Sequence, residues 1–415
     1  MRVLKWVAIG SGGLLALLVI AALILTQLVD PNLYRGPIER QVTAATGRAF
    51  RLQGDIDLTF FPWLSLTTGP AALSSPPDFP EPQFLHWREA HVGVRLLPLL
   101  RGELVVDRVR LVGLEARLLR AADGRVNWAF ESGATDARGT LPDIEGIELR
   151  DSQLNYEDAT SGTRLRLDDL RLDLGPVRTG APLRVEAAAT VSSPAVPERA
   201  SVSIATVVTL GPPLLLANTE VSGKLFDGRF AESGIPWRFA APSLRYEPAN
   251  GAVAASAWEL DFNEARIRGA TTAALGDTPS ASGTLSLAPV SLRGTLAAAG
   301  IELPRARDPD AYKTVKLSAG FRVSGQSLQI EPLEIVLDDT RLTGRVTRDE
   351  GVIRFSLQGD RMDLGRYLKP EDVESEPFVF PTAALKALRA EGTLDIDEAT
   401  LEGVKMRGVR LSAGP

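Results

Sequence analysis

The stretch that decides the fold is residues 165–174, Leu-Arg-Leu-Asp-Asp-Leu-Arg-Leu-Asp-Leu. Apolar and charged side chains alternate along it, a period of two that is typical of a β-strand with one apolar and one solvated face. Similar alternation recurs on both sides, from Phe50 to Leu411. The sequence therefore predicts a mostly β protein. The apolar positions that we select as candidate face residues are Leu165, Leu167, Leu170, Leu172, Leu174, Leu333, Ile335, Leu337, Ile353, Phe355 and Leu357.

Short turn signals separate these runs and favour hairpins, which join antiparallel neighbours. The composition, with 37 Gly and 28 Pro, supports many turns. We therefore expect an elongated, curled antiparallel sheet. The turn signals are Asp123-Gly124, Ser161-Gly162, Asp227-Gly228, Asn250-Gly251 and Glu350-Gly351.

Two short helices interrupt the predicted strands. Pro37 suits a first helical turn, Ile38 and Val42 are spaced i, i+4, and Gly47 suits the position after the last turn. Residues 292–299 followed by Gly300 have the same helix-then-glycine pattern.

Alternation alone leaves two arrangements open for the apolar face. In a closed sandwich or barrel, two apolar faces meet and form a core. In a long curled sheet, the same side chains line a groove. Both arrangements require the same sequence pattern.

The N-terminus predicts a membrane anchor. Residues 6–28 contain no charged side chain and follow Arg2 and Lys5. About 20 apolar residues span a bilayer as a helix, and the preceding positive charges place residues 1–5 in the cytoplasm. No small-x-small cleavage site follows, so we expect an uncleaved single-pass transmembrane helix. Its apolar anchor positions include Trp6, Leu14, Leu18, Leu23 and Leu28.

The remainder divides into two predicted regions joined by a linker. Residues 30–130 form an N-terminal module, in which we expect Trp128 to be packed. Residues 131–143 are rich in turn-forming types and predict the linker. Residues 144–415 form the elongated β region.

Composition excludes several classes of site. With 46 basic and 52 acidic side chains the net charge is 46 − 52 = −6, which argues against nucleic-acid binding. The chain has no Cys and two His, so cysteine chemistry is excluded, and we expect no metal, no cofactor and no catalytic residues. The acidic pairs Asp168-Asp169 and Asp338-Asp339 are expected at solvated turn or edge positions, because strand neighbours point to opposite faces.

Ordered motifs across the chain resemble the AsmA family. Each contains Gly, Pro or Trp, and together they extend over nearly the whole sequence. Gly365 stands where the family often has Asp. Family members usually continue beyond a segment like residues 390–415, so we expect a C-terminally truncated chain or a short member of the family. The motifs are Asp30–Ile38, Thr46-Gly47-Arg48, Gly54-Asp55-Ile56, Phe61–Leu64, Leu97–Gly102, Asp123–Trp128, Leu292–Pro304, Asp308-Pro309, Leu337–Gly344 and Asp363–Leu368.

This resemblance implies a non-enzymatic protein of the Gram-negative inner membrane, with a periplasmic body built as a U-shaped β-groove. Such proteins are similar to TamB and to the bridge-like lipid transfer proteins. The implied function is outer-membrane lipid homeostasis, with phospholipids, the inner membrane and the outer membrane as partners. The alternative is an assembly or scaffold factor that binds outer-membrane proteins or their assembly machinery. An enzyme acting on polysaccharide is disfavoured, because no acid–base constellation is visible.

Overall fold

The computed structural model of the chain describes residues 30–59, 64–95, 105–130, 144–178, 180–194, 199–228, 234–276, 278–368, 389–401 and 403–414. These residues are mostly β, as the alternation predicted. The chain divides into two compact units, residues 1–204 and 205–415, and the boundary falls inside β12 (Arg199–Thr209). We call them unit 1 and unit 2.

Unit 1 begins with a helix that packs on a small sheet. After the 3-10 turn η1 (Pro31–Tyr34), helix α2 (Arg35–Thr46) ends at Gly47, whose φ of 68° is left-handed. The predicted helix is confirmed. Its Ile38 and Val42 pack against a buried core that includes Phe50, Ile56 and Phe84. Trp128 packs against the same core, so its predicted packing is also confirmed.

Strand β9 (Ile147–Asp158) connects the strands of unit 1. Its first part pairs with β7 (Val106–Val112) and its second part with β8 (Glu115–Arg120), both in parallel. Its other edge pairs with β10 (Thr163–Leu174), which pairs in turn with β11 (Leu183–Ser192). The remaining strands of unit 1 are β1 (Phe50–Leu52), β2 (Ile56–Thr59), β3 (Leu64–Thr68), β4 (Ala71–Ser74), β5 (Gln83–Trp87) and β6 (Glu89–Val94).

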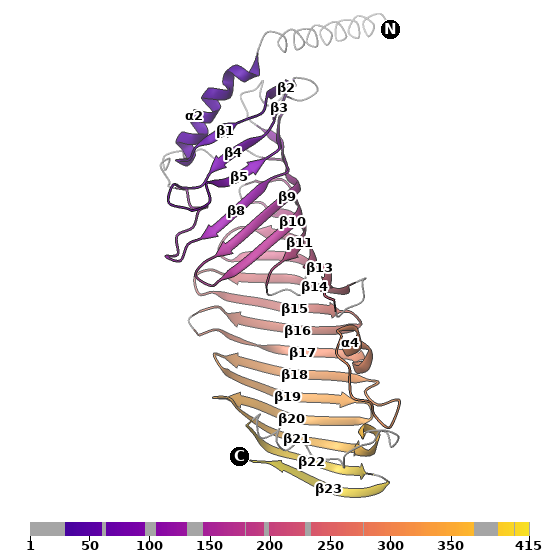
Figure 1. Cartoon of the computed structure of the whole chain (residues 1–415). Coiled ribbons are helices and arrows are strands. Elements are labelled where there is room, and N and C mark those ends of the chain that lie inside the picture. The colour runs from indigo at the N-terminus through magenta and orange to yellow at the C-terminus, as the bar shows by residue number, and fades with distance from the viewer. Residues whose placement is uncertain are drawn as a thin grey trace, which may run out of the picture. The chain divides into compact units, whose positions relative to one another are not determined.

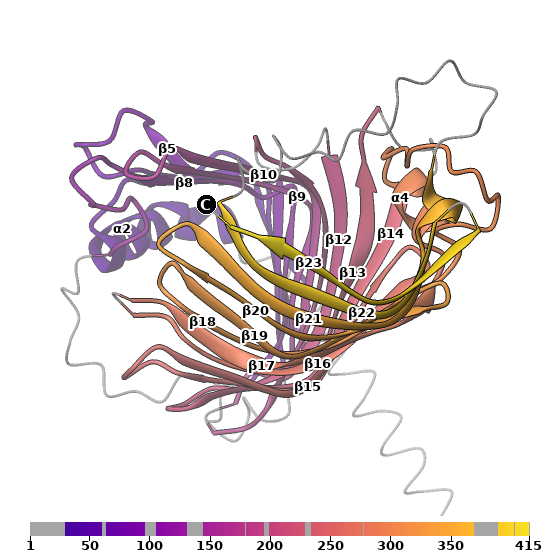
Figure 2. The same ribbon diagram turned by 90° about the horizontal axis from the view of Figure 1, so that it is seen from below.

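Unit 2 is a sheet in which each strand pairs with the next along the chain, as Figure 1 shows for β13 to β23. Seen from below, the strands from β15 to β23 are bowed along their length (Figure 2). The predicted second helix is confirmed as α4 (Leu292–Ala298), which Ser291 caps. The other elements are β13 (Leu214–Phe226), β14 (Ile235–Glu247), β15 (Ala252–Phe262), β16 (Ala265–Ala274), β17 (Ser280–Val290), β18 (Val315–Ser324), β19 (Ser327–Leu337), β20 (Thr340–Asp349), β21 (Val352–Asp363), η2 (Leu364–Tyr367), β22 (Ala390–Leu401) and β23 (Val404–Ala413).

The expectation of antiparallel neighbours throughout was wrong at three places. The pairs β7–β9, β8–β9 and β21–β22 are parallel. In a parallel pair both strands begin at the same end of the sheet, so the chain must cross back to that end before the second strand begins. The segment between Asp363 and Ala390 is long enough for this crossover. The turn dipeptides in the sequence do not distinguish a crossover from a hairpin, so the parallel pairing was not predicted.

Two predicted segments lie outside the described residues. They are the membrane anchor at 6–28 with its cytoplasmic tail at 1–5, and the linker at 131–143. In the part of the chain that the structure describes, none of the helices has both the length and the apolar character needed to span a bilayer.

Candidate functional site

The leucines of the deciding stretch share one face of β10 because the strand bulges in its middle. Leu167 lies opposite Leu154 and Val191, and the next paired apolar residue is Leu170. Strict alternation would place Leu167 and Leu170 on opposite faces. One extra residue, Asp169 with a φ of 52°, restores the common face, and a short acidic residue tolerates this left-handed conformation.

The register of unit 2 places a row of residues across the sheet, one from each strand from β13 to β23, and all of them except Gly359 have apolar side chains. Residues directly opposite in a ladder share a face, so all members of the row share one face. At about 4.8 Å between strands the row extends for roughly 50 Å. We call the face that carries it the apolar face. The row is Val221, Phe239, Leu260, Ile267, Leu287, Leu317, Ile335, Leu342, Gly359, Ile396 and Val409.

The neighbouring row lies on the other face and is polar except at one position. Ion pairs between neighbouring strands lie on this face, including Glu220 with Arg238 at 2.8 Å and Glu259 with Arg268 at 2.7 Å. The sheet of unit 2 therefore has one apolar and one charged face. The polar row is Glu220, Ala240, Glu259, Arg268, Ser286, Ser318, Glu334, Thr343, Gln358, Asp395 and Arg410.

The apolar face is open along most of the row. Ile396 is buried, with 1% of its surface exposed, but Leu317, Ile335 and Leu342 are only half-buried. Among the described residues, the extensive contacts of β13 to β23 join consecutive strands, apart from those between β22 and η2. A second sheet packed against this face would bury Leu317, Ile335 and Leu342 in the core between the sheets. The described residues therefore favour the groove arrangement over the sandwich.

An aromatic patch covers part of the apolar face at β14 to β16. Trp258 lies opposite Gly269, where a Cβ atom would come within 2.4 Å of the indole ring. The indole N–H donates to the Thr271 hydroxyl at 2.9 Å, and Phe239 stacks on the ring with centroids 6.5 Å apart. Gly269 therefore provides the space in which Trp258 lies flat on the sheet.

The candidate residues fall on these faces as follows. The five leucines from Leu165 to Leu174 lie on β10 in unit 1, while Leu333, Ile335 and Leu337 lie on β19 and Ile353, Phe355 and Leu357 on β21 in unit 2. Strand β20 separates the last two sets, and the register joins them through it. Leu333 is buried and the others are half-buried. Their contact with lipid stays a prediction, and the anchor positions Trp6, Leu14, Leu18, Leu23 and Leu28 lie outside the described residues.

The Asp338 carboxylate joins separate segments of unit 2 through hydrogen bonds. Asp338 stands in the β19–β20 hairpin turn, as expected, but its carboxylate is not simply solvated. It accepts hydrogen bonds from the backbone N–H groups of Tyr312, Lys313 and Thr314 at 2.8, 2.8 and 3.0 Å, and from the Tyr367 hydroxyl at 2.8 Å. Burial opposes its ionisation, but the hydrogen bonds outweigh this effect and lower the pKa of Asp338. Burial and the adjacent carboxylate raise the pKa of Tyr367.

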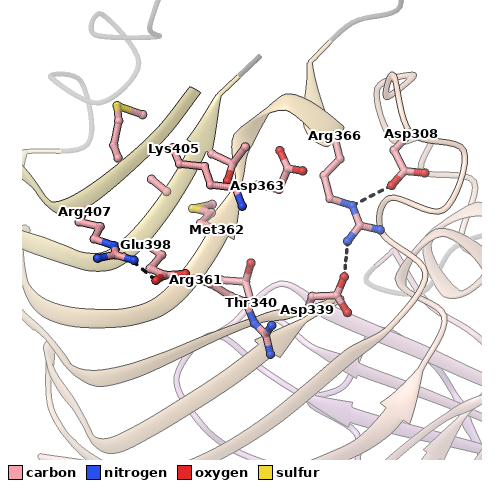
Figure 3. A pocket seen from close by; sticks show the side chains of 13 residues that line it. Asp308, Asp339, Thr340, Arg361, Met362, Asp363, Arg366, Glu398, Lys405 and Arg407 are labelled. Carbon is pink, nitrogen blue, oxygen red and sulfur yellow. Dashed lines mark hydrogen bonds and ion pairs between the residues drawn. The ribbon is translucent and has the colours of Figure 1, made fainter. Parts of the chain in front are cut away.

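Arg366 forms a second junction of this kind. Its guanidinium lies 2.9 Å from the Asp308 carboxylate and 2.8 Å from that of Asp339 (Figure 3). Burial alone would lower the pKa of Arg366, but the neighbouring acidic groups outweigh it and raise the pKa. Three motifs that are far apart in the sequence, at 308–309, 337–344 and 363–368, therefore meet here.

The sequence also predicted that the chain holds no metal ion, and this stays a prediction. The described residues contain no group of three or more His, Asp or Glu side chains placed to hold a metal ion. His91 bonds the Thr67 hydroxyl at 3.1 Å and lies 2.9 Å from the Glu89 carboxylate.

Sequence reasoning missed most of the apolar face. Strands β13 to β17 use Ala, Gly and Thr between their large apolar residues, so their alternation is weak. Bulges shift the phase within a strand, as between Ala255 and Trp258. A search for apolar alternation that allows one extra residue at Asp or Asn would have recovered part of the face.

Comparisons with known proteins agree with the motifs. The chain is 26% identical over 136 residues to AsmA family protein YhjG of Escherichia coli (strain K12), which covers 30% of this chain and 20% of that protein. It is 29% identical over 152 residues to Protein AsmA of the same organism, covering 35% of this chain and 24% of that protein. These alignments thus take in less than a quarter of each relative's length. No solved structure matches the chain. The family model of the AsmA family matches residues 1–378, and the chain therefore belongs to the AsmA family.

Proposed function

We propose that this chain is a non-enzymatic, inner-membrane-anchored periplasmic protein that accommodates phospholipid acyl chains on its apolar face and supports outer-membrane lipid homeostasis. The observation that carries the proposal is the apolar row from Val221 to Val409, interrupted only at Gly359, most of which is half-buried. Soluble monomers rarely expose a contiguous apolar surface of this length unless it binds something. Family membership supports the same function class.

The energetics favour a continuous face over a single pocket. Each methylene group that leaves water gains about 0.8 kcal/mol, so exposing two tails of about 16 carbons costs roughly 25 kcal/mol. A lipid that moves along a row of similar side chains keeps its tails covered at each step. Apart from Gly359, the row consists of aliphatic and aromatic side chains of mixed shape, which suits sliding chains better than one fixed ligand.

A photo-crosslinking residue at Ile335 tests the proposal, with Glu334 as the matched control. The two are neighbours on β19 and lie on opposite faces. We expect phospholipid adducts at Ile335 and none at Glu334, and the same contrast in unit 1 between Leu172 and Arg171. Equal yields on both faces, or no lipid at Ile335 and Leu172, would refute the proposal.

A second candidate is an assembly or scaffold factor for outer-membrane proteins. Among the described residues β23 pairs with β22 alone, and Val404 on it is 62% exposed. A strand edge with exposed apolar side chains can accept a strand from another protein. Protein adducts from a crosslinker at Val404, in a chain that yields no lipid adduct at Ile335, would favour this candidate.

A further inference from the structure

A cavity of ≈ 720 Å³ opens at the edge of unit 2 beside the Asp338 and Arg366 junctions. Its walls come from the loop at Asp308, the hairpin at Asp339 and the neighbouring ends of β21, β22 and β23. Four basic and four acidic side chains line it, so its formal charge is balanced. Figure 3 shows the labelled members of this lining.

The charges in the cavity are not all paired. Arg366 is held between Asp308 and Asp339, and Arg407 lies 3.7 Å from Glu398. Arg361 and Lys405 lie between these two groups in Figure 3. Within the described part of the chain, neither of them makes an ion pair. Two cations therefore remain available to an anionic group.

Arg361 and Lys405 are close enough in the sheet to share a ligand. They stand on β21 and β23, with β22 between them. Two strand spacings amount to about 10 Å, and long basic side chains from both strands can reach a group lying over the middle strand. The exposed carboxylate of Asp339, 80% accessible, faces the same cavity and can accept an ammonium group.

The apolar face continues to the cavity. The pairing of the three strands skips Asp360, Asp397 and Gly408, and beyond this irregularity the row is Met362, Ala399 and Met406. Ala399, three residues beyond the buried Ile396, is itself only 1% exposed, so the apolar side has shifted by one position there. These three residues also line the cavity. Arg361 and Lys405 are the strand neighbours of Met362 and Met406 and point to the opposite face of the sheet, so the apolar and the charged face both end at this cavity.

We propose that this cavity binds the phosphodiester of a zwitterionic phospholipid headgroup, with Arg361 and Lys405 on the phosphate and Asp339 on the amine. The inference rests on the proposed function and assigns a headgroup site to it. A balanced lining with separated charges suits a ligand that carries both signs. Free phosphate shares the anionic chemistry but would gain nothing from the methionine and alanine side chains nearby.

The test uses the full-length chain in detergent with a photo-crosslinking residue at Leu357, which stands four residues, roughly 13 Å, from Arg361 along β21. The protein is mixed with equal amounts of phosphatidylethanolamine, phosphatidylglycerol and diacylglycerol, and the adducts are quantified by mass spectrometry. We expect phosphatidylethanolamine adducts to exceed diacylglycerol adducts about tenfold, as loss of one or two charge-assisted hydrogen bonds predicts. The double variant R361Q/K405Q should lower this ratio to near one.

The double variant K316Q/R345Q is the matched control. It removes the same charge from exposed positions of unit 2 outside the cavity, and it should keep the wild-type ratio. An unchanged ratio in R361Q/K405Q, or a preference for phosphatidylglycerol, overturns the headgroup site while lipid adducts leave the proposed function intact. Absence of every lipid adduct overturns both. Excess glycerophosphoethanolamine should abolish the preference; if inorganic phosphate abolishes it equally well, the ligand is free phosphate and the lipid assignment fails.

Discussion

The replacement D338N gives the sharpest test of the polar junction in unit 2. The Asp338 carboxylate accepts on both oxygens: Oδ1 from the N–H groups of Lys313 and Thr314, and Oδ2 from the Tyr312 N–H and the Tyr367 hydroxyl. An asparagine amide must turn its NH₂ group toward one of these donor pairs. A hydroxyl can rotate to accept, but a backbone N–H cannot, so at least one hydrogen bond is lost.

The magnitude follows from the change in hydrogen bonding. A bond to a charged acceptor contributes about 1.5–3 kcal/mol and a neutral one about 0.5–1.5 kcal/mol. Losing one bond and weakening the others, at a half-buried site, should lower the free energy of unfolding of unit 2 by about 2–4 kcal/mol. The matched control D339N removes an exposed carboxylate that pairs with Arg366, and it should cost less than about 1 kcal/mol.

Urea unfolding and hydrogen–deuterium exchange measure these effects together. Exchange should rise at residues 312–314 in D338N and stay unchanged in D339N. Because the folded-state pKa of Asp338 is lowered, its stabilisation is present above the unfolded-state pKa of about 3.9 and is lost as the pH falls through the folded-state pKa. The difference between wild type and D338N should therefore shrink below about pH 4. Equal stabilities of D338N and D339N at neutral pH, with unchanged exchange, would refute this account.

Three further predictions concern the two units. I335E should lower the stability of unit 2 by only about 1 kcal/mol, because the face is open; a loss above about 4 kcal/mol in urea unfolding would indicate a packed core instead. R48M should destabilise unit 1 by about 1–3 kcal/mol, because Arg48, 5% exposed, donates to the Ala129 carbonyl at 2.8 Å and lies over the rings of Phe84 and Phe130; an unchanged unfolding midpoint would contradict this role. The Thr160 hydroxyl lowers the pKa of Asp158 to about 2, so the stability that this carboxylate lends should persist at pH 4 and disappear toward pH 2, and D158N should abolish that acid dependence; an NMR titration of Asp158 near pH 4 would disprove it.

The sequence predicted the strands better than their relation to one another. Alternation identified β10, β19 and β21, because large aliphatic residues alternate there with charged ones. It could not reveal the left-handed Asp169, since Asp-Asp occurs equally at turns and edges. The parallel pairing of β21 with β22 also lacks a local signal, because it depends on where a long connection returns.

The polar junctions show a second limit of sequence reasoning. Asp338 and Asp339 stand in a turn and bind different partners, which lie 24 residues before Asp338 at Thr314, 29 residues after it at Tyr367, and 27 residues after Asp339 at Arg366. No periodicity links Thr314, Asp338 and Tyr367. The three backbone N–H groups that donate to this carboxylate come from a distant segment, and only the folded chain brings them to it.

The pairing of unit 2 has a consequence for how it folds. The ladders from β13 to β21 join strands adjacent along the chain, and all except β17–β18, whose connection contains α4, close a short loop at low entropic cost. Stability in such an array is close to a sum of nearest-neighbour terms, and growth can proceed hairpin by hairpin from several starting points. The ladder between β21 and β22 is different, because it combines a long connection with parallel pairing, which is slightly less stable per residue than antiparallel pairing. The β22–β23 hairpin should consequently dock last and detach first, which makes the end that carries the cavity the most dynamic part of the sheet.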